Sequence, residues 1–182
     1  MRDGLEARSF LLAGGPGAGK STVSEVLRDQ GMHAIDLDYG FARHENRAGE
    51  QVPFPAEPSW DWLMAHSWNW RIPLIDAAIA EATGPVVLAG TARNMFDLLD
   101  RFDVLLLLTM DDATRNARLA DPRRNNVFGK VGDTALWSRW WHQLVESELT
   151  ARGAVIIDAS QPIEAVVTEV RNALDTDVPR SW

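Results

Sequence analysis

Eight consecutive residues near the start of the chain constrain its fold more than any other feature. Residues 14–21 read Gly-Gly-Pro-Gly-Ala-Gly-Lys-Ser, which matches the pattern Gly-x-x-x-x-Gly-Lys-[Ser/Thr] at every fixed position. An apolar run at residues 10–13 precedes them, and a segment with apolar residues at helical spacing follows. In such a strand–loop–helix setting, backbone N–H groups turn inward around phosphate oxygens, and the helix adds its positive N-terminal end. The sequence therefore predicts a phosphate-binding loop; the alternative is a glycine-rich turn that binds nothing.

Two side chains of this loop have separate expected roles in binding a nucleoside triphosphate. Lys20 would reach the β- and γ-phosphates, and the hydroxyl of Ser21 would bind Mg²⁺. The residues expected to hold ATP here are Gly14, Gly15, Pro16, Gly17, Ala18, Gly19, Lys20, Ser21 and Thr22. ATP and Mg²⁺ are the expected cofactors.

The rest of the chain alternates short apolar runs with longer segments of helical periodicity. Strands are expected at residues 9–13, 33–35, 86–89, 104–109 and 155–157. Helices are expected at 20–29, 60–81 with a break at Pro73, 94–101, 112–120, 134–152 and 163–174, with Ser59 and Asp133 as N-caps. This alternation is typical of an α/β protein with a parallel sheet. We expect a single domain over residues 1–174 and a tail at 175–182.

Composition excludes several classes of function. The net charge of -8 argues against nucleic acid as a partner, because binding to its backbone depends on lysine and arginine. The 182 residues contain no cysteine, which excludes disulfides and thiolate chemistry, and the four histidines have no metal-ligand spacing. No apolar run approaches the length of a membrane span. A cytoplasmic protein without a membrane partner is expected.

The motifs after the phosphate loop indicate a branch of phosphotransferases. The strings Asp-x-x-Gly and Asn-Lys-x-Asp, expected in GTPases, do not occur. Residues 86–94, Val-Val-Leu-Ala-Gly-Thr-Ala-Arg-Asn, are similar to the strand ending in Asp-Gly-Phe-Pro-Arg of nucleotide kinases, which puts Arg93 at the position of a phosphate-binding arginine. The chain departs from that pattern at Ala89, where those kinases carry an Asp near the metal.

Over residues 9–174 the chain thus resembles the nucleoside monophosphate kinase and shikimate kinase branch of the P-loop kinases. The resemblance implies a three-layer α/β/α P-loop NTPase fold with a five-stranded parallel sheet, acceptor-binding helices and a lid. Asp36-Leu37-Asp38 looks like the Asp-x-Asp of shikimate kinase-like enzymes. By that likeness Asp36 would assist Mg²⁺, and Asp38 would orient the acceptor or accept its proton. A turn capped by one of these residues is the alternative.

Residues 118–132 resemble the lid of these kinases. The segment carries Arg118, Arg123 and Arg124, whose planar, permanently charged groups suit a transferring phosphoryl group. Arg118 and Arg124 are the expected catalytic arginines, and Arg118 and Arg123 are expected to bind ATP. Ala159 lies in the stretch that resembles the adenine-contacting loop. A solvated basic helix end would have the same composition.

Residues 36–83 would carry the acceptor pocket. The expected acceptor-binding residues are Asp36, Asp38, Arg43, Trp70, Arg71 and Arg93. By resemblance, Arg71 and Arg93 would form an anion clamp, although Arg71 could instead be an exposed surface residue. Trp62 or Trp70 could stack on a flat acceptor, because both lie off the apolar stripe of the expected helix.

These features predict a kinase that transfers the γ-phosphoryl group of ATP to a small acceptor, as a monomer or homodimer. A nucleoside or nucleoside monophosphate is the favoured acceptor, and a hydroxyl on a non-nucleotide metabolite, as in shikimate kinase, is the first alternative. Two alternatives lack an acceptor: a regulator that binds nucleotide without turnover, and a bare ATPase.

Overall fold

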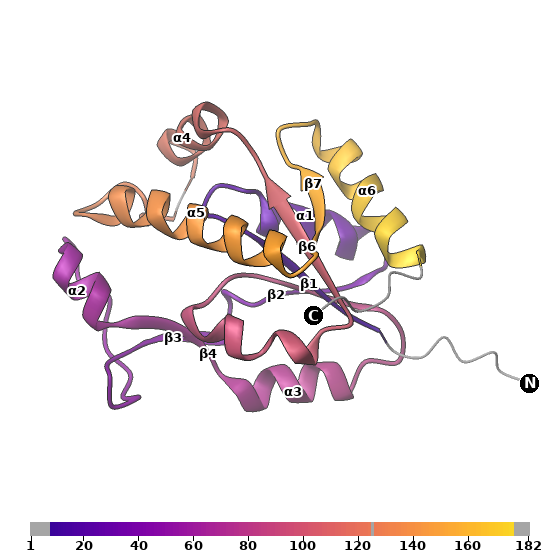
Figure 1. Cartoon of the computed structure of the whole chain (residues 1–182), viewed down its shortest axis with the longest axis horizontal. Helices are drawn as coiled ribbons and strands as arrows, with labels where there is room; N and C mark the ends of the chain where they lie inside the picture. Colours follow the sequence, from indigo (N-terminus) through magenta and orange to yellow (C-terminus); the bar gives the residue numbers. More distant parts are fainter. Residues whose placement is uncertain (1–7, 125, 177–182) are drawn as a thin grey trace, which may run out of the picture.

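A parallel five-stranded sheet forms the centre of the molecule (Figure 1). The computed structural model describes residues 8–124 and 126–176. The strands are β1 (Ser9–Gly14), β2 (His33–Asp36), β5 (Val86–Ala89), β6 (Val104–Thr109) and β7 (Val155–Asp158), in the order β2-β5-β1-β6-β7. All neighbouring pairs are parallel. The predicted α/β fold with five parallel strands is confirmed.

Alternating residues of the strands build two separate hydrophobic clusters, one on each face of the sheet. In β1, Phe10 and Leu12 pack with side chains of α1 (Lys20–Asp29) and α6 (Ile163–Asp175). Leu11 and Ala13 pack on the opposite face with side chains of α3 (Ile72–Ala80) and α5 (Thr134–Ala151). Because both faces are covered, the inner strands β1, β5 and β6 are almost wholly buried and mainly apolar, which is why the sequence pattern found them.

The acceptor-side segment differs most from the expectation. The predicted helix over 60–81 is wrong: α2 (Trp60–Ala65) ends after six residues, and β4 (Ser67–Trp70) follows before α3. β4 pairs antiparallel with β3 (Ala42–Glu45), which lies in the stretch expected to have no regular structure. Figure 1 shows this hairpin and α2 projecting beyond one end of the central sheet.

Smaller differences concern caps and short helices. The Ser59 hydroxyl accepts a hydrogen bond from the Trp62 N–H at 3.2 Å, as an N-cap should. Asp133 precedes α5, but its carboxylate accepts from the Trp60 N–H at 2.7 Å and so caps α2 instead. The expected helix at 94–101 is two 3₁₀ turns, η1 (Arg93–Asp97) and η2 (Leu99–Arg101).

Two findings concern the C-terminal end of the chain and the length of its helices. The last helix reaches Asp175, and most of the expected tail, 177–182, lies outside the described residues. In the described part of the chain, no helix combines the length and apolarity needed to cross a bilayer.

Candidate active site

The phosphate loop joins β1 to α1 at the carboxyl edge of the sheet, where parallel sheets carry their ligand sites. Gly19 occupies the N-cap position of α1 with φ of 88°, a left-handed conformation that glycine adopts without strain. It has no side chain to cap the helix, so the first N–H groups of α1 stay open for an anion. Ser21 and Thr22, in the first turn of α1, are exposed.

Lys20 is folded back onto the loop. Its Nζ donates to the carbonyl oxygens of Gly14 at 2.8 Å and Gly15 at 3.2 Å. Burial lowers the pKa of Lys20 below its usual range, and the carboxylates of Asp38 and Asp36 oppose that shift. The ammonium therefore lies at the meeting point of the phosphate loop and the carboxyl end of β2.

The two aspartates after β2 are held in a defined arrangement. An oxygen of Asp36 accepts a hydrogen bond from the Asp38 N–H at 3.0 Å, and Asp36 is buried. Asp38 accepts from the indole N–H of Trp68 at 3.3 Å. Burial raises the pKa of Asp38, with Asp36 adding to the rise and Lys20 opposing it. The hydrogen bond from the Asp38 N–H to Asp36 also caps the turn after β2, which was the alternative interpretation of these aspartates. The same carboxylate therefore stabilises the turn and faces the candidate site.

Asp36 lies beside Ala89, the position at which the resemblance predicted an acid. The two residues are partners in the register of β2 and β5, and the Leu37 N–H donates to the Ala89 carbonyl at 2.8 Å. A carboxylate therefore stands one strand away from the place where nucleotide kinases carry theirs.

A pocket of about 650 Å³ opens beside the phosphate loop. Its walls include Gly17, Ala18, Gly19, Thr22, Arg118, Asp121, Arg123, Arg124 and Ala159. Eight of its thirteen lining residues were expected to bind ATP or to act on it, so the pocket adjoins the predicted nucleotide side.

The three arginines of the 118–132 segment have different partners. Arg118, at the end of α4 (Asp112–Ala120), donates to the Ala159 carbonyl at 2.7 Å, which puts it on the expected adenine side rather than beside Lys20. Arg124 is turned inward, donates to the Phe128 carbonyl at 2.6 Å, and lies near enough to Lys20 to lower the pKa of that lysine. Arg123 is turned to solvent, where its hydrogen bonds lower the pKa of Asp121 to about 2.

On the acceptor side, Arg93 presents an unsatisfied donor. Among the described residues, its buried Nη1 has no hydrogen-bond partner, and its guanidinium carbon lies 6.0 Å from the centroid of the Trp137 ring. Asn94 fixes the start of η1, the 3₁₀ turn that carries Arg93, because its side-chain amide makes two 2.9 Å hydrogen bonds with the backbone of Trp70. Arg71 is exposed at the start of α3, as the alternative interpretation expected.

Strand geometry directs Arg43, an expected acceptor-binding residue, away from the two aspartates. Arg43 lies on β3 with its guanidinium paired to Glu45 at 2.7 Å, and Asn69 donates to the same carboxylate. Alternation along β3 and β4 puts this group on the face opposite to the one bearing Trp68. Arg43 therefore points away from Asp38.

Trp70 is a core residue rather than a stacking platform. It is 2% exposed and packs against Phe102 with ring centroids 6.3 Å apart. Trp62 is partly exposed but already stacks on His66, with centroids 4.3 Å apart. The expected aromatic surface for a flat acceptor is thus absent from both candidates.

Sequence reasoning missed two residues of the site. Trp68 fits the apolar spacing of the expected helix at 60–81 and so indicated no role in the site, yet its indole N–H donates to Asp38. His142 on α5 received no role, yet it lies against Gly15 of the phosphate loop. No local pattern signals either contact, because each joins elements far apart in the sequence.

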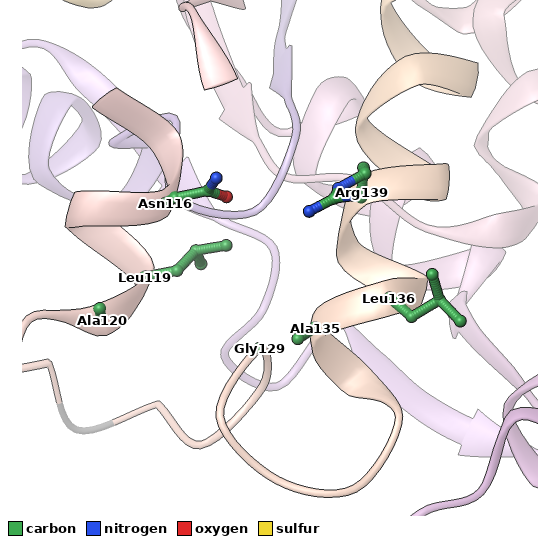
Figure 2. Close-up of a pocket in the computed structure, with 7 residues that line it drawn as sticks. All are labelled: Asn116, Leu119, Ala120, Gly129, Ala135, Leu136 and Arg139. Atoms are coloured by element: carbon green, nitrogen blue, oxygen red, sulfur yellow. The ribbon is translucent and has the colours of Figure 1, made fainter. Parts of the chain in front are cut away.

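A second pocket, of about 310 Å³, lies on the other side of the 118–132 segment. Figure 2 shows Asn116 and Leu119 of α4 facing Arg139 of α5 across it. Its lining shares no residue with the 650 Å³ pocket.

Comparison with known proteins identifies the fold. A shikimate kinase from Acinetobacter baumannii, solved in complex with shikimate, aligns with a TM-score of 0.60 at 14% identity, covering 96% of this chain and 97% of that one. A gluconokinase from Sinorhizobium meliloti 1021 gives 0.52 at 20% identity, covering 92% and 91%. A deoxyadenosine kinase from M. mycoides with bound dATP gives 0.54 at 14%, covering 92% and 100%. The chain has the fold of the P-loop kinases.

Other comparisons add no closer relative. No protein-family model matches the chain, and no curated protein matches it. The expected three-layer P-loop fold is confirmed, and the resemblance to small-molecule kinases holds at the level of the fold.

Proposed function

We propose that the chain is an ATP-dependent kinase that transfers the γ-phosphoryl group to a hydroxyl of a small acceptor bearing an anionic group. One observation carries the proposal: the Lys20 ammonium lies at the end of the phosphate loop within electrostatic reach of Asp36 and Asp38. The ammonium and the carboxylates act on different reactants. The ammonium neutralises the triphosphate, whereas Asp38 orients the acceptor hydroxyl and takes up its proton.

In-line transfer requires positioning and charge neutralisation more than covalent chemistry. The loop N–H groups and Lys20 would hold the phosphates of ATP in the 650 Å³ pocket. Arg124, which is turned inward and donates to the carbonyl oxygens of Asn126 and Phe128, would exchange those partners for the transferring phosphoryl group. Arg118 would stay with Ala159 on the adenine side.

Two oxygen donors fit the Mg²⁺ ion that accompanies ATP. The Ser21 hydroxyl and the Asp36 carboxylate are the groups that would hold it, and Asp36 replaces the acid missing at Ala89. When bound, the ion would neutralise charge on the phosphates.

The anionic part of the acceptor is inferred from Arg93. A buried guanidinium N–H without a partner is costly unless a ligand satisfies it, and a carboxylate or phosphate suits it. Exposed Arg71 is the second member of the proposed clamp. Two of the solved structures with this fold are a shikimate kinase and a gluconokinase, which is consistent with a hydroxylated carboxylate.

A nucleoside or nucleoside monophosphate is the second candidate acceptor. The 86–94 segment resembles nucleotide kinases, and one structure with this fold is a deoxyadenosine kinase. The burial of Trp70 and the stacking of Trp62 on His66 remove one of the two reasons for preferring a nucleobase, the aromatic side chains expected to stack on it.

The test is a screen for acceptor-dependent ATP consumption, with products identified by mass spectrometry. Hydroxy acids, polyols, nucleosides and nucleoside monophosphates are tested in separate pools with ATP and Mg²⁺. We expect a phosphorylated hydroxy acid. Asp38→Asn should reduce its formation by about 100-fold or more, whereas Asp61→Asn, at an exposed carboxylate of α2, should not.

Each other result of the screen has a defined meaning. A phosphorylated nucleoside would select the second candidate. Nucleotide binding without any product would indicate the regulator, and hydrolysis independent of every acceptor would indicate the ATPase; either would overturn the proposal.

A further inference from the structure

A histidine from a distant helix supports the phosphate loop from behind. His142 lies on α5 and is 4% exposed. A Cβ atom added to Gly15 would lie 2.8 Å from Cβ and 2.9 Å from Cγ of His142, and still nearer to Nδ1. The imidazole ring is therefore packed directly on the backbone of Gly15.

The phosphate-loop pattern does not explain why residue 15 is glycine. The fixed glycines of that pattern are Gly14 and Gly19, and position 15 is variable. Gly15 is also absent from the glycines with positive φ, so its conformation does not demand glycine. The close approach of His142 does, because any side chain at position 15 would overlap the ring.

Gly15 has a structural task within the loop. Its carbonyl oxygen accepts from the Ala18 N–H at 3.1 Å, which closes the turn, and from Lys20 Nζ at 3.2 Å. A residue that fixes Gly15 therefore fixes both the curvature of the loop and the resting place of the lysine.

His142 itself is held by a buried polar group between the two helices that flank the 118–132 segment. Its Nε2 lies 3.5 Å from the Glu146 carboxylate. Arg115 of α4, 1% exposed, pairs with Asp112 at 3.1 Å and approaches the Ser138 hydroxyl at 3.5 Å. Burial lowers the pKa of His142, Arg115 and Lys20 act in the same direction, and Asp112 opposes them. A neutral ring thus faces the loop without repelling the cation that must move to the phosphates.

We propose that His142 is a positioning residue for nucleotide binding, which fills the space behind Gly15 and holds the phosphate loop in its binding conformation. The inference rests on the proposed function only in taking a nucleotide as the ligand of the loop. The carbonyl of Gly15 is the point at which the ring acts on the loop.

A double-mutant cycle tests the contact, with the dissociation constant of Mg·ADP measured by calorimetry. Gly15→Ala should weaken binding by about tenfold or more, because the new methyl group displaces the loop from the ring. In the His142→Ala background the same substitution should cost less than about threefold, since the obstacle is gone. His142→Ala alone should weaken binding by about three- to tenfold, because it leaves a cavity behind the loop.

Matched controls separate positioning from general destabilisation. Gly84→Ala, where an added Cβ meets no atom within 4 Å, and Gln143→Ala, an exposed neighbour of His142, should leave Mg·ADP binding unchanged. Thermal melts establish that each variant is folded. If His142→Ala does not fold, His142→Asn replaces it in the cycle. In steady-state assays His142→Ala should raise the KM for ATP and leave the KM for the acceptor unchanged.

Equal costs of Gly15→Ala in both backgrounds, or unchanged binding by folded His142→Ala, would overturn the inference. Failure of the proposed function looks different. In that case the unmodified protein would bind no Mg·ADP, or would bind it and phosphorylate nothing while the coupling between positions 15 and 142 persisted.

Discussion

Two arginines that look equivalent in the sequence should differ sharply in their effect on the acceptor. Arg93 carries a buried N–H that has no partner within the described part of the chain, whereas Arg43 is paired with Glu45 on the hairpin face opposite to Trp68. We expect Arg93→Leu to raise the KM for the acceptor by about 10- to 100-fold, the cost of one charge-assisted hydrogen bond. Arg43→Leu should change it by less than about twofold. Steady-state kinetics with the acceptor found in the screen measure both; equal effects would refute the clamp.

Asp38 should make the protein less stable near neutral pH, because function requires a buried charge. Its pKa in the folded state is raised, so protons bind the folded chain more readily than the unfolded one. The cost of the charge is therefore absent below the usual range of aspartate and grows as pH rises through the folded pKa. Asp38→Asn should melt at a higher temperature than the unmodified protein at about pH 7 and lose that advantage near pH 4.

The same titration should appear in the rate of transfer. The acid limb of the profile of kcat against pH should lie above the usual range of an aspartate side chain, since only the ionised form accepts a proton.

The melting experiment has its own contrary result. If Asp38→Asn and the unmodified protein melt at the same temperature at every pH, the Asp38 carboxylate carries no burial cost.

Residues whose role depends on spacing along the chain were predictable, and residues whose role depends on pairing were not. Lys20 and Ser21 are set by the phosphate-loop pattern, and Lys20 lies within electrostatic reach of Asp38. Arg43 was misjudged because the direction of a side chain on a strand depends on register with a partner, which no local pattern encodes. Trp70 was expected on a helix, but it ends β4 and is buried in the core.

At the scale of elements, hydrogen bonds and an aromatic contact join the 36–83 segment to the 118–132 segment and to Asp133, which follows it. The Gly132 N–H donates to the Glu57 carboxylate at 2.8 Å, and the Asp133 N–H donates to the Pro58 carbonyl at 2.9 Å. The rings of Phe54 and Phe128 lie 6.3 Å apart. A movement of one segment must therefore involve the other.

This junction predicts that acceptor and nucleotide bind cooperatively. Gly132→Ala should disrupt it, because the added Cβ would lie 2.9 Å from the Pro58 nitrogen and nearer still to the carbonyl oxygen. We expect the variant to lose most of the increase in acceptor affinity that Mg·ADP produces, on the order of fivefold or more. Calorimetric titration of the acceptor with and without Mg·ADP measures this increase.

Gly31→Ala is the matched control for the junction. Gly31 also has a positive φ, 80°, but an added Cβ there meets no atom within 4 Å. It should lose a comparable amount of stability, about 1 kcal/mol, without loss of cooperativity. Loss of cooperativity in both variants would attribute the effect to stability rather than to the contact.

The error over residues 60–81 shows why this junction could not be read from the sequence. Trp60, Leu63 and Met64 fit a helix, and Trp68 extends the same spacing, so the pattern continues across the start of β4. Its partner β3 reads Ala-Arg-His-Glu, which has no strand signal of its own. The hairpin exists because the two segments pair, and the aromatic rings around His44 cover it.

On the scale of the whole molecule, the residues that stabilise the fold lie apart from the residues of the candidate site. The two hydrophobic clusters lie on either face of the sheet, while the charged groups of the site gather at its carboxyl edge. The inner strands β1, β5 and β6 were predictable because they are buried along almost their whole length and are mainly apolar. The edge strands β2 and β7 were recognised from shorter apolar stretches, and each contains an exposed residue, such as His33 or Ile156. A net charge of -8 coexists with the cations of the candidate site because they come from three separate parts of the chain: Lys20 from the phosphate loop, Arg93 from the turn after β5, and Arg118 and Arg124 from the 118–132 segment.

This separation predicts that nucleotide can stabilise the molecule without being needed for folding. At a concentration of Mg·ADP about 100 times its Kd, binding should add about 2.7 kcal/mol and raise the Tm by about 5–10 °C. Lys20→Ala should abolish the shift, yet melt without ligand close to the unmodified protein. The substitution removes two hydrogen bonds to Gly14 and Gly15, but it also removes a cation whose pKa is lowered by burial, and these effects oppose each other.

Arg28→Ala is the control for loss of positive charge, because Arg28 is an exposed cation near the other end of α1. It should keep the full rise in Tm on Mg·ADP binding. Differential scanning calorimetry with and without Mg·ADP distinguishes the outcomes. A large fall in Tm for ligand-free Lys20→Ala would mean that the loop depends on its lysine for structure. The Lys20 ammonium would then be part of the fold as well as of the site, and loss of transfer in that variant would no longer report on catalysis alone.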